Sequence, residues 1–238
     1  MRRFRDSSVP AGAREWFTDS EFENTMDDLR AQSGDDVFTA SQGVDVDLVL
    51  LRAYKASPDF VPLPSGVLGR TTFYPDGRLH VEVCRELAEN AEHSLVSRRR
   101  LRSTLAHECG HIAFHRHQFL VVDEQQSLFA AAPSPNPHVL CRGDAIDDRV
   151  RQRDGREYQA NRGMASLLLP SRLLRTHLEE ALKTRDCETL RDAVVAGKGQ
   201  VVLRDACDVF DVSLEMMLYR VQELKLLPRE DAQSEFGW

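Results

Sequence analysis

The stretch His107-Glu108-Cys109-Gly110-His111 decides the fold, because H-E-x-x-H on a helix brings two imidazoles and one carboxylate to one place. Positions i and i+4 of an α-helix lie about 5–6 Å apart on one face, and one Zn²⁺ ion with Zn–N bonds of about 2.0–2.1 Å can bridge that span. Glu108 lies beside such a metal, where it cannot easily be a third ligand but can take a proton from a water that the metal acidifies. The stretch therefore predicts a metal-binding helix that carries its own base.

The residues around this stretch favour a helix. From Ser97 to about Phe114 there is no proline, and Gly110 is the only glycine. The apolar residues recur at helical spacing and form one stripe, which consists of Leu101, Leu105 and Ile112. His107 and His111 lie beside that stripe, so a helix buried along it shows both rings to a cleft at the edge of the core.

A catalytic zinc site needs a third protein ligand, and two histidines follow the motif. His115 lies about 12 Å along the helix from His107, too far to share the ion, and is expected at the surface or behind a ligand. His117 has the spacing of the metzincin peptidases, but that pattern needs a glycine where this chain has Phe114. Without a turn there, His117 points away from the metal, which disfavours it as a ligand.

Glu157 is the better third ligand. It begins an amphipathic pattern that Pro170 stops, which predicts a second helix. A carboxylate from that helix completes a His₂Glu set and leaves the fourth position open for water, as catalytic zinc requires. Asn161 follows one turn later and is expected either to hydrogen-bond a ligand histidine or to be a solvated helix residue.

Two motifs taken together carry a family resemblance. Residues 104–111 read TLAHECGH, and residues 157–170 read EYQANRGMASLLLP. They resemble the T-x-A-H-E-x-G-H and E-x-x-A-N-x-F-A-x-x-L-L-M-P motifs of the ImmA/IrrE family of zinc metallopeptidases, and the likeness spans about residues 60–170. The resemblance implies that zinc is bound by His107, His111 and Glu157, and that Glu108 is the catalytic base.

Two positions depart from the family pattern without touching the inferred ligands. Gly163 stands where the family usually has Phe, and Leu169 stands where it often has Met. A glycine inside a helix costs up to about 1 kcal/mol relative to alanine. We therefore expect a close approach of another backbone, or a small substrate pocket, at Gly163.

The fold class is expected to be α+β. Residues 67–83 predict a β-hairpin, because two alternating runs flank the turn Pro75-Asp76-Gly77. A small β-sheet packed on the H-E-x-x-H helix and a second ligand helix make a minimal zincin-like domain. An edge strand of such a sheet can bind an extended peptide. Residues 45–55 fit either a helix or a strand.

The chain is expected to have three parts. Residues 1–35 form a polar, partly disordered segment, with no structure in the first dozen residues and a helix from Glu15 to about Gln32. Residues 36–170 form the zincin-like domain. Residues 171–238 form a helical module with four helical stretches, at 172–183, 188–196, 201–210 and 213–226, the last capped by Ser213.

The last two of these stretches resemble a helix-turn-helix. The would-be recognition helix carries two acidic and two basic residues, which are Glu215, Glu223, Arg220 and Lys225. No net positive charge would therefore face phosphates, and packing or partner binding is favoured over DNA binding.

Three further features have more than one interpretation. His138 could stabilise an oxyanion near the metal, and Cys141 could be a thiolate ligand or a redox sensor, but a loop histidine and a small buried cysteine are favoured. Both follow residues 130–137, which are too proline-rich for regular structure and predict a surface loop. The basic run 98–102 is interpreted as a solvated helix face rather than a phosphate site.

Composition agrees with a cytoplasmic enzyme. The 238 residues contain five cysteines without a C-x-x-C pair, so no disulfide framework is expected. The basic start is not followed by an apolar run, so no secretory signal is expected. No run approaches the ~20 apolar residues of a membrane span, so no membrane partner is expected either. A formal net charge of −7 argues against broad nucleic-acid binding.

These observations predict a zinc-dependent endopeptidase that hydrolyses a peptide bond in a partner protein. The resemblance implies a regulatory substrate, commonly a helix-turn-helix repressor in a stress-response or mobile-element system. The alternative is a non-cleaving regulatory or toxin–antitoxin binding module. In that case the zinc site is a scaffold, and the C-terminal helices bind a repressor or DNA.

Overall fold

The chain is α+β, mostly helical with a small sheet. The computed structural model describes residues 2–5, 13–38, 43–74, 76–120, 138–142 and 155–228. Two compact units divide the chain: one consists of Met1–Val37 and Val46–Met164, the other of Phe38–Asp45 and Ala165–Trp238. Among the described helices, none combines the length and apolarity needed to cross a membrane.

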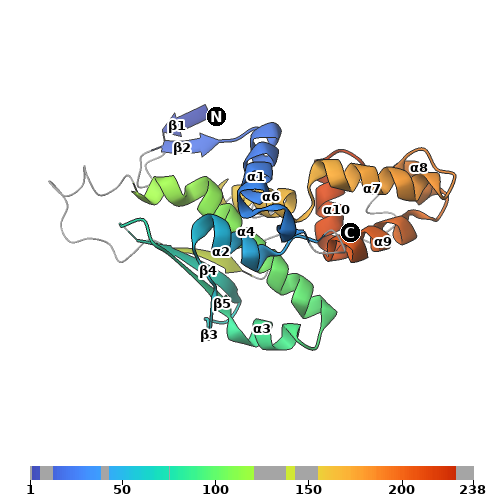
Figure 1. The fold of residues 1–238 in the computed structure, drawn as a ribbon. Helices are drawn as coiled ribbons and strands as arrows, with labels where there is room; N and C mark the ends of the chain where they lie inside the picture. The colour runs from blue at the N-terminus through green and yellow to red at the C-terminus, as the bar shows by residue number, and fades with distance from the viewer. Residues whose placement is uncertain are drawn as a thin grey trace. The chain divides into compact units, whose positions relative to one another are not determined.

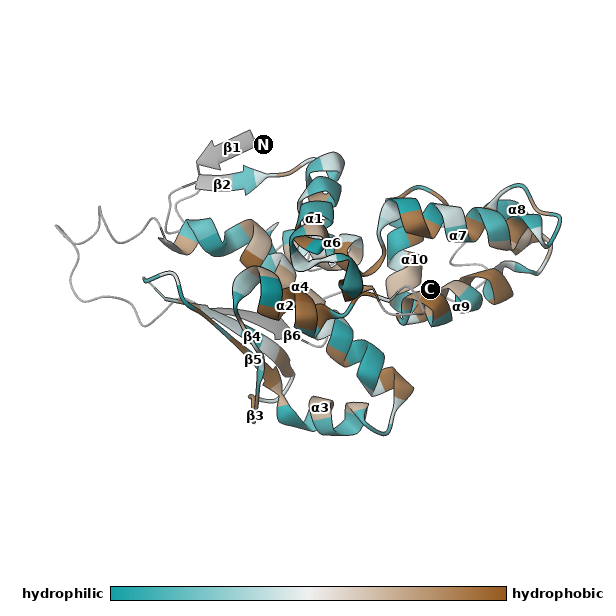
Figure 2. Cartoon of the chain, viewed as in Figure 1, coloured by the Kyte–Doolittle hydropathy of each residue, from teal (hydrophilic) through white to brown (hydrophobic). Residues whose placement is uncertain are grey.

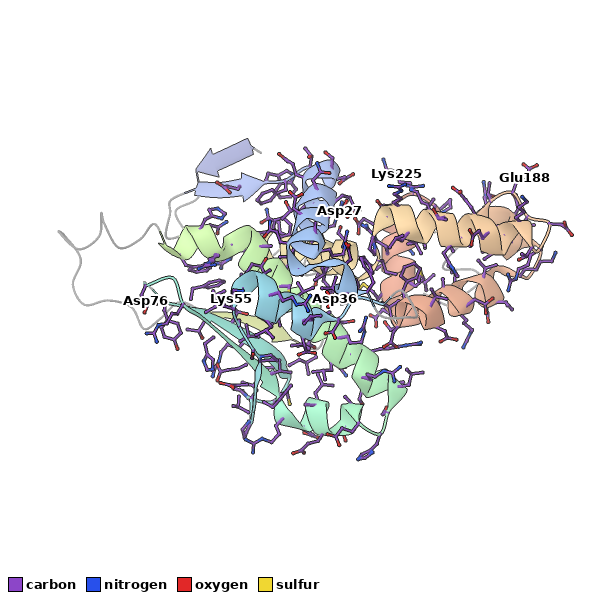
Figure 3. All side chains as sticks on the ribbon, in the orientation of Figure 1. Asp27, Asp36, Lys55, Asp76, Glu188 and Lys225 are labelled. Carbon is purple, nitrogen blue, oxygen red and sulfur yellow. The ribbon has the colours of Figure 1, made fainter. Side chains whose placement is uncertain are left out.

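A four-stranded sheet in the order β3-β5-β4-β6 belongs to the first unit. Its strands are β3 (Asp59–Val61), β4 (Val67–Phe73), β5 (Leu79–Cys84) and β6 (His138–Arg142). β4 runs antiparallel to both β5 and β6, while β3 runs parallel to β5. The predicted hairpin over residues 67–83 is therefore confirmed, and Asp76 lies at its tip (Figure 3).

Burial alternates along β4 as it does in a strand with one covered face. The buried face holds Val67, Gly69, Thr71 and Phe73. Phe73 stacks on Phe119 of α4 (Leu95–Leu120), with 4.6 Å between the ring centroids. The covered face of the sheet is thus the one that meets the helix carrying the H-E-x-x-H motif.

The predicted helix over residues 97–114 is confirmed and extends from Leu95 to Leu120. Figure 1 shows α4 as the long helix of the first unit, beside the sheet. It also contacts α1 (Asp19–Ser33) through Phe22 and Phe114, whose ring centroids are 4.9 Å apart. The other helices that the structure describes in this unit are η1 (Asp35–Val37), α2 (Val46–Tyr54), α3 (Arg85–Ala91) and α6 (Gly155–Leu168), the last of which ends in the second unit.

The N-terminal region differs from the prediction. Glu15 does not begin a helix but lies in β2 (Ala13–Trp16), which pairs antiparallel with β1 (Arg2–Arg5). The helix begins after Thr18, because the Thr18 side chain accepts a hydrogen bond from the Glu21 backbone and the Glu21 side chain accepts one from the Thr18 backbone. The expectation of disorder is therefore wrong for residues 2–5, and residues 1 and 6–12 lie outside the described residues. Residues 46–54, left open from the sequence, form the helix α2.

Among the described residues of the second unit, four helices after α6 match the four predicted stretches. They are α7 (Ser171–Lys183), α8 (Leu190–Val195), α9 (Gly199–Phe210) and α10 (Leu214–Glu223). Ser213 caps α10 as predicted, since its hydroxyl accepts a hydrogen bond from the Met216 backbone at 3.1 Å. Figure 2 shows apolar and polar residues interleaved along α7 and α9, as expected of helices with one buried face. The domain boundaries at 35 and 170 stay predictions.

Candidate metal centre

His107, His111 and Glu157 lie together, with one donor atom from each within 4.8 Å of the others. The Nε2 atoms of His107 and His111 are 2.9 Å apart. The carboxylate oxygens of Glu157 lie 3.2 Å from Nε2 of His107 and 3.3 Å from Nε2 of His111. Both rings are buried and Glu157 is nearly so. Three donors from two helices, α4 and α6, therefore converge on one point.

These distances fit a single metal ion. Ligand atoms at about 2.0–2.1 Å from a tetrahedral zinc are about 3.3 Å from one another. The three separations between donors are 2.9, 3.2 and 3.3 Å. Burial raises the pKa of Glu157, but its hydrogen bonds with the two histidines outweigh burial and leave that pKa below its ordinary range. Glu157 is therefore ionised, as a metal ligand must be, and this group of residues can hold a metal ion.

Asn161 orients the first histidine. Its side-chain oxygen lies 2.9 Å from Nδ1 of His107. A carbonyl oxygen only accepts hydrogen bonds, so Nδ1 carries the proton and Nε2 keeps its lone pair for the metal. Asn161 therefore hydrogen-bonds a candidate ligand histidine and is not a solvated helix residue, since only 6% of its surface is exposed.

His115 is fully buried, so the expectation of a surface position is wrong. Its Nδ1 lies 3.1 Å from Nδ1 of His111, and its Nε2 lies 2.9 Å from the side-chain oxygen of Gln159. It is thus placed behind a ligand histidine, the other position expected for it. Burial lowers the pKa of His115 well below its ordinary value, so the ring is neutral.

Glu108 faces the sheet instead of α6. Its Oε2 accepts a hydrogen bond from the Thr71 hydroxyl in β4. Its Oε1 is buried and has no hydrogen-bond partner among the described residues. Burial raises the pKa of Glu108 to about 7, while His107 and Thr71 act to lower it. One oxygen of this carboxylate is therefore hydrogen-bonded, and the other has no hydrogen-bond partner in the part of the chain that the structure describes.

Gly69 makes room for that second oxygen. A Cβ atom at Gly69 would come within 2.5 Å of Glu108 Oε1 and 2.9 Å of Thr104 Cγ2. β4 thus approaches α4 closely at the position of the carboxylate. Neither Gly69 nor Thr71 was singled out from the sequence, because contact between a strand and a helix 37 residues apart leaves no local signal.

Glycines also let the two ligand helices approach each other. A Cβ at Gly163 would lie 2.7 Å from Cε2 of Phe114 and 3.2 Å from Cα of Gly110. Of the two expectations for Gly163, the close approach of another backbone is therefore confirmed. Without it, α6 could not bring Glu157 to the histidines on α4.

Other residues considered from the sequence lie elsewhere. His117 is 42% exposed, and its Nε2 is 2.7 Å from the Glu15 carboxylate rather than near the three donors. His138 and Cys141 lie in β6, opposite Thr72 and Gly69 in register, so neither is in a loop. The positions of their side chains lie outside what the structure describes, and so does the predicted loop 130–137.

Comparisons with known proteins add nothing to this geometry. No protein-family model matches the chain, and no curated protein matches it. The likeness to ImmA/IrrE motifs accordingly stays a prediction from the sequence. The geometry itself shows that two imidazoles and a carboxylate could hold a metal ion, and that a second carboxylate, Glu108, follows His107 in the chain.

Proposed function

We propose that this protein is a zinc-dependent endopeptidase. The observation that carries the proposal is the state of Glu108: it follows a metal-ligand candidate directly in sequence, and its Oε1 is buried without a partner among the described residues. Two imidazoles and a carboxylate are the ligand set of several catalytic zinc enzymes. The sheet of the first unit, α4 and α6 together fit a minimal zincin-like domain.

In this proposal His107, His111 and Glu157 hold the zinc. Zinc, when bound, acts as a Lewis acid toward a carbonyl oxygen and acidifies water. Glu108 accepts the proton of the attacking water at Oε1, while its Oε2 stays bonded to Thr71, and delivers that proton to the leaving amine. Asn161 keeps the His107 ring in the orientation and tautomer that the ligand role needs.

The substrate proposed from the resemblance is a regulatory protein, such as a helix-turn-helix repressor. The alternative is a binding module that holds such a partner through its C-terminal helices without cutting it. The two differ in what happens to the partner. Cleavage that depends on Glu108 supports the peptidase, and stable co-elution with an intact partner supports the binding module.

The test combines metal analysis with a cleavage assay. We expect about one zinc per chain in the wild type, and sharply less in His107→Ala and Glu157→Ala. Glu108→Gln should keep the zinc but fail to shorten a repressor encoded beside this gene, or any member of a peptide library. His117→Ala serves as the control, since it removes a histidine of the same helix and should keep both zinc and activity.

Two results would overturn the proposal. If Glu157→Ala keeps its zinc and His117→Ala loses it, the ligand set is wrong. If Glu108→Gln cleaves peptides as fast as the wild type, Glu108 is not the base.

A further inference from the structure

The ring of His111 must present Nε2 to the metal, so its proton must be on Nδ1. Nothing in His111 itself decides this, because a neutral imidazole can carry its proton on either nitrogen. The atom next to His111 Nδ1 is Nδ1 of His115, at 3.1 Å. Two neutral ring nitrogens at that distance share one proton in a hydrogen bond. Which of the two nitrogens carries it depends on whether the other nitrogen of His115 donates or accepts a hydrogen bond.

Gln159 determines that the other nitrogen of His115 is a hydrogen-bond donor. Nε2 of His115 lies 2.9 Å from the side-chain oxygen of Gln159. Since that oxygen can only accept, His115 donates from Nε2. A neutral ring that carries its proton on Nε2 has a lone pair on Nδ1, and that lone pair accepts a proton from His111.

The orientation of Gln159 is fixed in turn by the N-terminal part of the chain. Its amide nitrogen donates to the backbone oxygen of Glu15 at 2.6 Å. A flipped amide would set two carbonyl oxygens against each other, so the side-chain oxygen must face His115. His115 is 0% exposed and Gln159 is 4% exposed, so bulk water offers no competing partner.

We propose that Gln159 and His115 are positioning residues that fix the tautomer of His111 and so leave its Nε2 lone pair free for the metal. The hydrogen bonds run in one direction, from His111 to His115 to Gln159, and from Gln159 to the Glu15 carbonyl. This arrangement does for His111 what Asn161 does for His107, through three residues instead of one. The inference rests on the metal centre proposed above and not on peptide cleavage.

The first test measures zinc affinity by competition with a chromogenic chelator. His115→Phe and Gln159→Leu should bind zinc about 10- to 100-fold more weakly than the wild type, as is usual when a group behind a metal ligand is lost. Gln118→Leu is the matched control, because Gln118 is a buried amide on α4 that takes no part in these hydrogen bonds. Unchanged affinity in His115→Phe, or an equal loss in Gln118→Leu, would overturn the inference.

The second test needs no variant and so does not depend on whether a variant folds. In wild-type protein with ¹⁵N-labelled histidine, a scalar coupling should connect Nδ1 of His111 with Nδ1 of His115, and the shared proton should be bonded to His111. A proton bonded to His115 Nδ1, or the absence of a coupling, would refute the inference. A role in packing alone would not predict this proton position.

The two tests separate this inference from the proposed function. If the wild type binds no zinc, the metal centre fails, and the spectrum of the metal-free protein still decides which ring owns the proton. If zinc binds and the proton is on His111 but no peptide is cut, the positioning role holds and the peptidase does not.

Discussion

A Cβ atom on Gly110 would lie 2.6 Å from the carbonyl oxygen of Ala160, so α4 and α6 meet there at backbone distance. Only a residue without a side chain allows this contact. Glu157 lies one helical turn before Ala160 and depends on the same contact to reach the histidines.

Gly110→Ala should therefore weaken both the fold and the metal centre. Overpacking of this kind costs about 1–3 kcal/mol of unfolding free energy, and zinc affinity should fall because α6 moves outward with Glu157. Urea unfolding and chelator competition measure the two effects. Gly66→Ala is the control: its Cβ meets nothing within 4 Å but its φ is +81°, so it should lose stability and keep zinc affinity. Full zinc affinity in Gly110→Ala would contradict the argument.

Gly69→Ala should damage catalysis and leave zinc in place. The new methyl group would displace Glu108 Oε1, and a displacement of about 1 Å in a reacting group can cost about 100-fold in rate. Zinc content by metal analysis and peptide cleavage by mass spectrometry follow the two properties. Leu68→Ala, the neighbouring residue on the other face of β4, should change neither. Loss of zinc with retained activity is the opposite of the expected pattern.

Asn161→Leu should weaken zinc binding about 10- to 100-fold, because Nδ1 of His107 loses its acceptor and the ring loses its preferred tautomer. Asn161→Asp keeps an oxygen at that position and should retain most of the affinity. Chelator competition on both variants checks this. Equal losses in the two variants would show that the amide acts through packing rather than as an acceptor.

The ion pair between Arg70 and Glu82, which lies outside the candidate metal centre, predicts that the free energy of unfolding depends on pH. The Arg70 guanidinium donates to Glu82 at 2.6 and 2.7 Å and holds the pKa of that carboxyl below its ordinary value. Because the pKa of Glu82 is lower in the folded than in the unfolded state, the ion pair stabilises the fold at pH values above the unfolded-state pKa of about 4.3. This stabilisation is lost as the pH falls through the folded-state pKa.

Glu82→Gln should therefore be less stable than the wild type at pH 6, and the difference should shrink as the pH falls below about 4.3. Urea unfolding between pH 3 and pH 7 gives the comparison. Glu89→Gln, at an exposed position of α3, should show no such trend. A difference that grows toward acid pH would have the wrong sign for this ion pair.

Much of the fold follows from local sequence patterns. Helical spacing predicts α4, α6 and the four helices of the second unit, and a turn between two alternating runs predicts the hairpin of β4 and β5. These patterns repeat within a few residues, so no knowledge of the tertiary structure is needed to read them. The start of α1 differs from the predicted one because the reciprocal cap at Thr18 and Glu21 sets it, and the spacing of apolar residues does not mark a cap.

In the candidate site too, some residues follow from local sequence patterns and others do not. Spacing brings His107 and His111 together, and the second amphipathic helix supplies Glu157. The groups behind these residues come from far along the chain: Gln159 bonds to Glu15 across 144 positions. His115 is different, because it is four residues beyond His111 and so lies beside it on the helix, and the position behind a ligand is one of the two that the sequence predicts for it.

Consecutive residues of α4 face different neighbours, because each step along a helix turns by about 100°. His107 faces α6, whereas Glu108 faces β4. Harmful substitutions should therefore fall into two genetic classes. Substitutions on the α6 side lower the affinity for zinc, so excess zinc in the growth medium should rescue them. Substitutions on the β4 side leave zinc bound but remove the acceptor for the proton of the attacking water, so excess zinc should not rescue them.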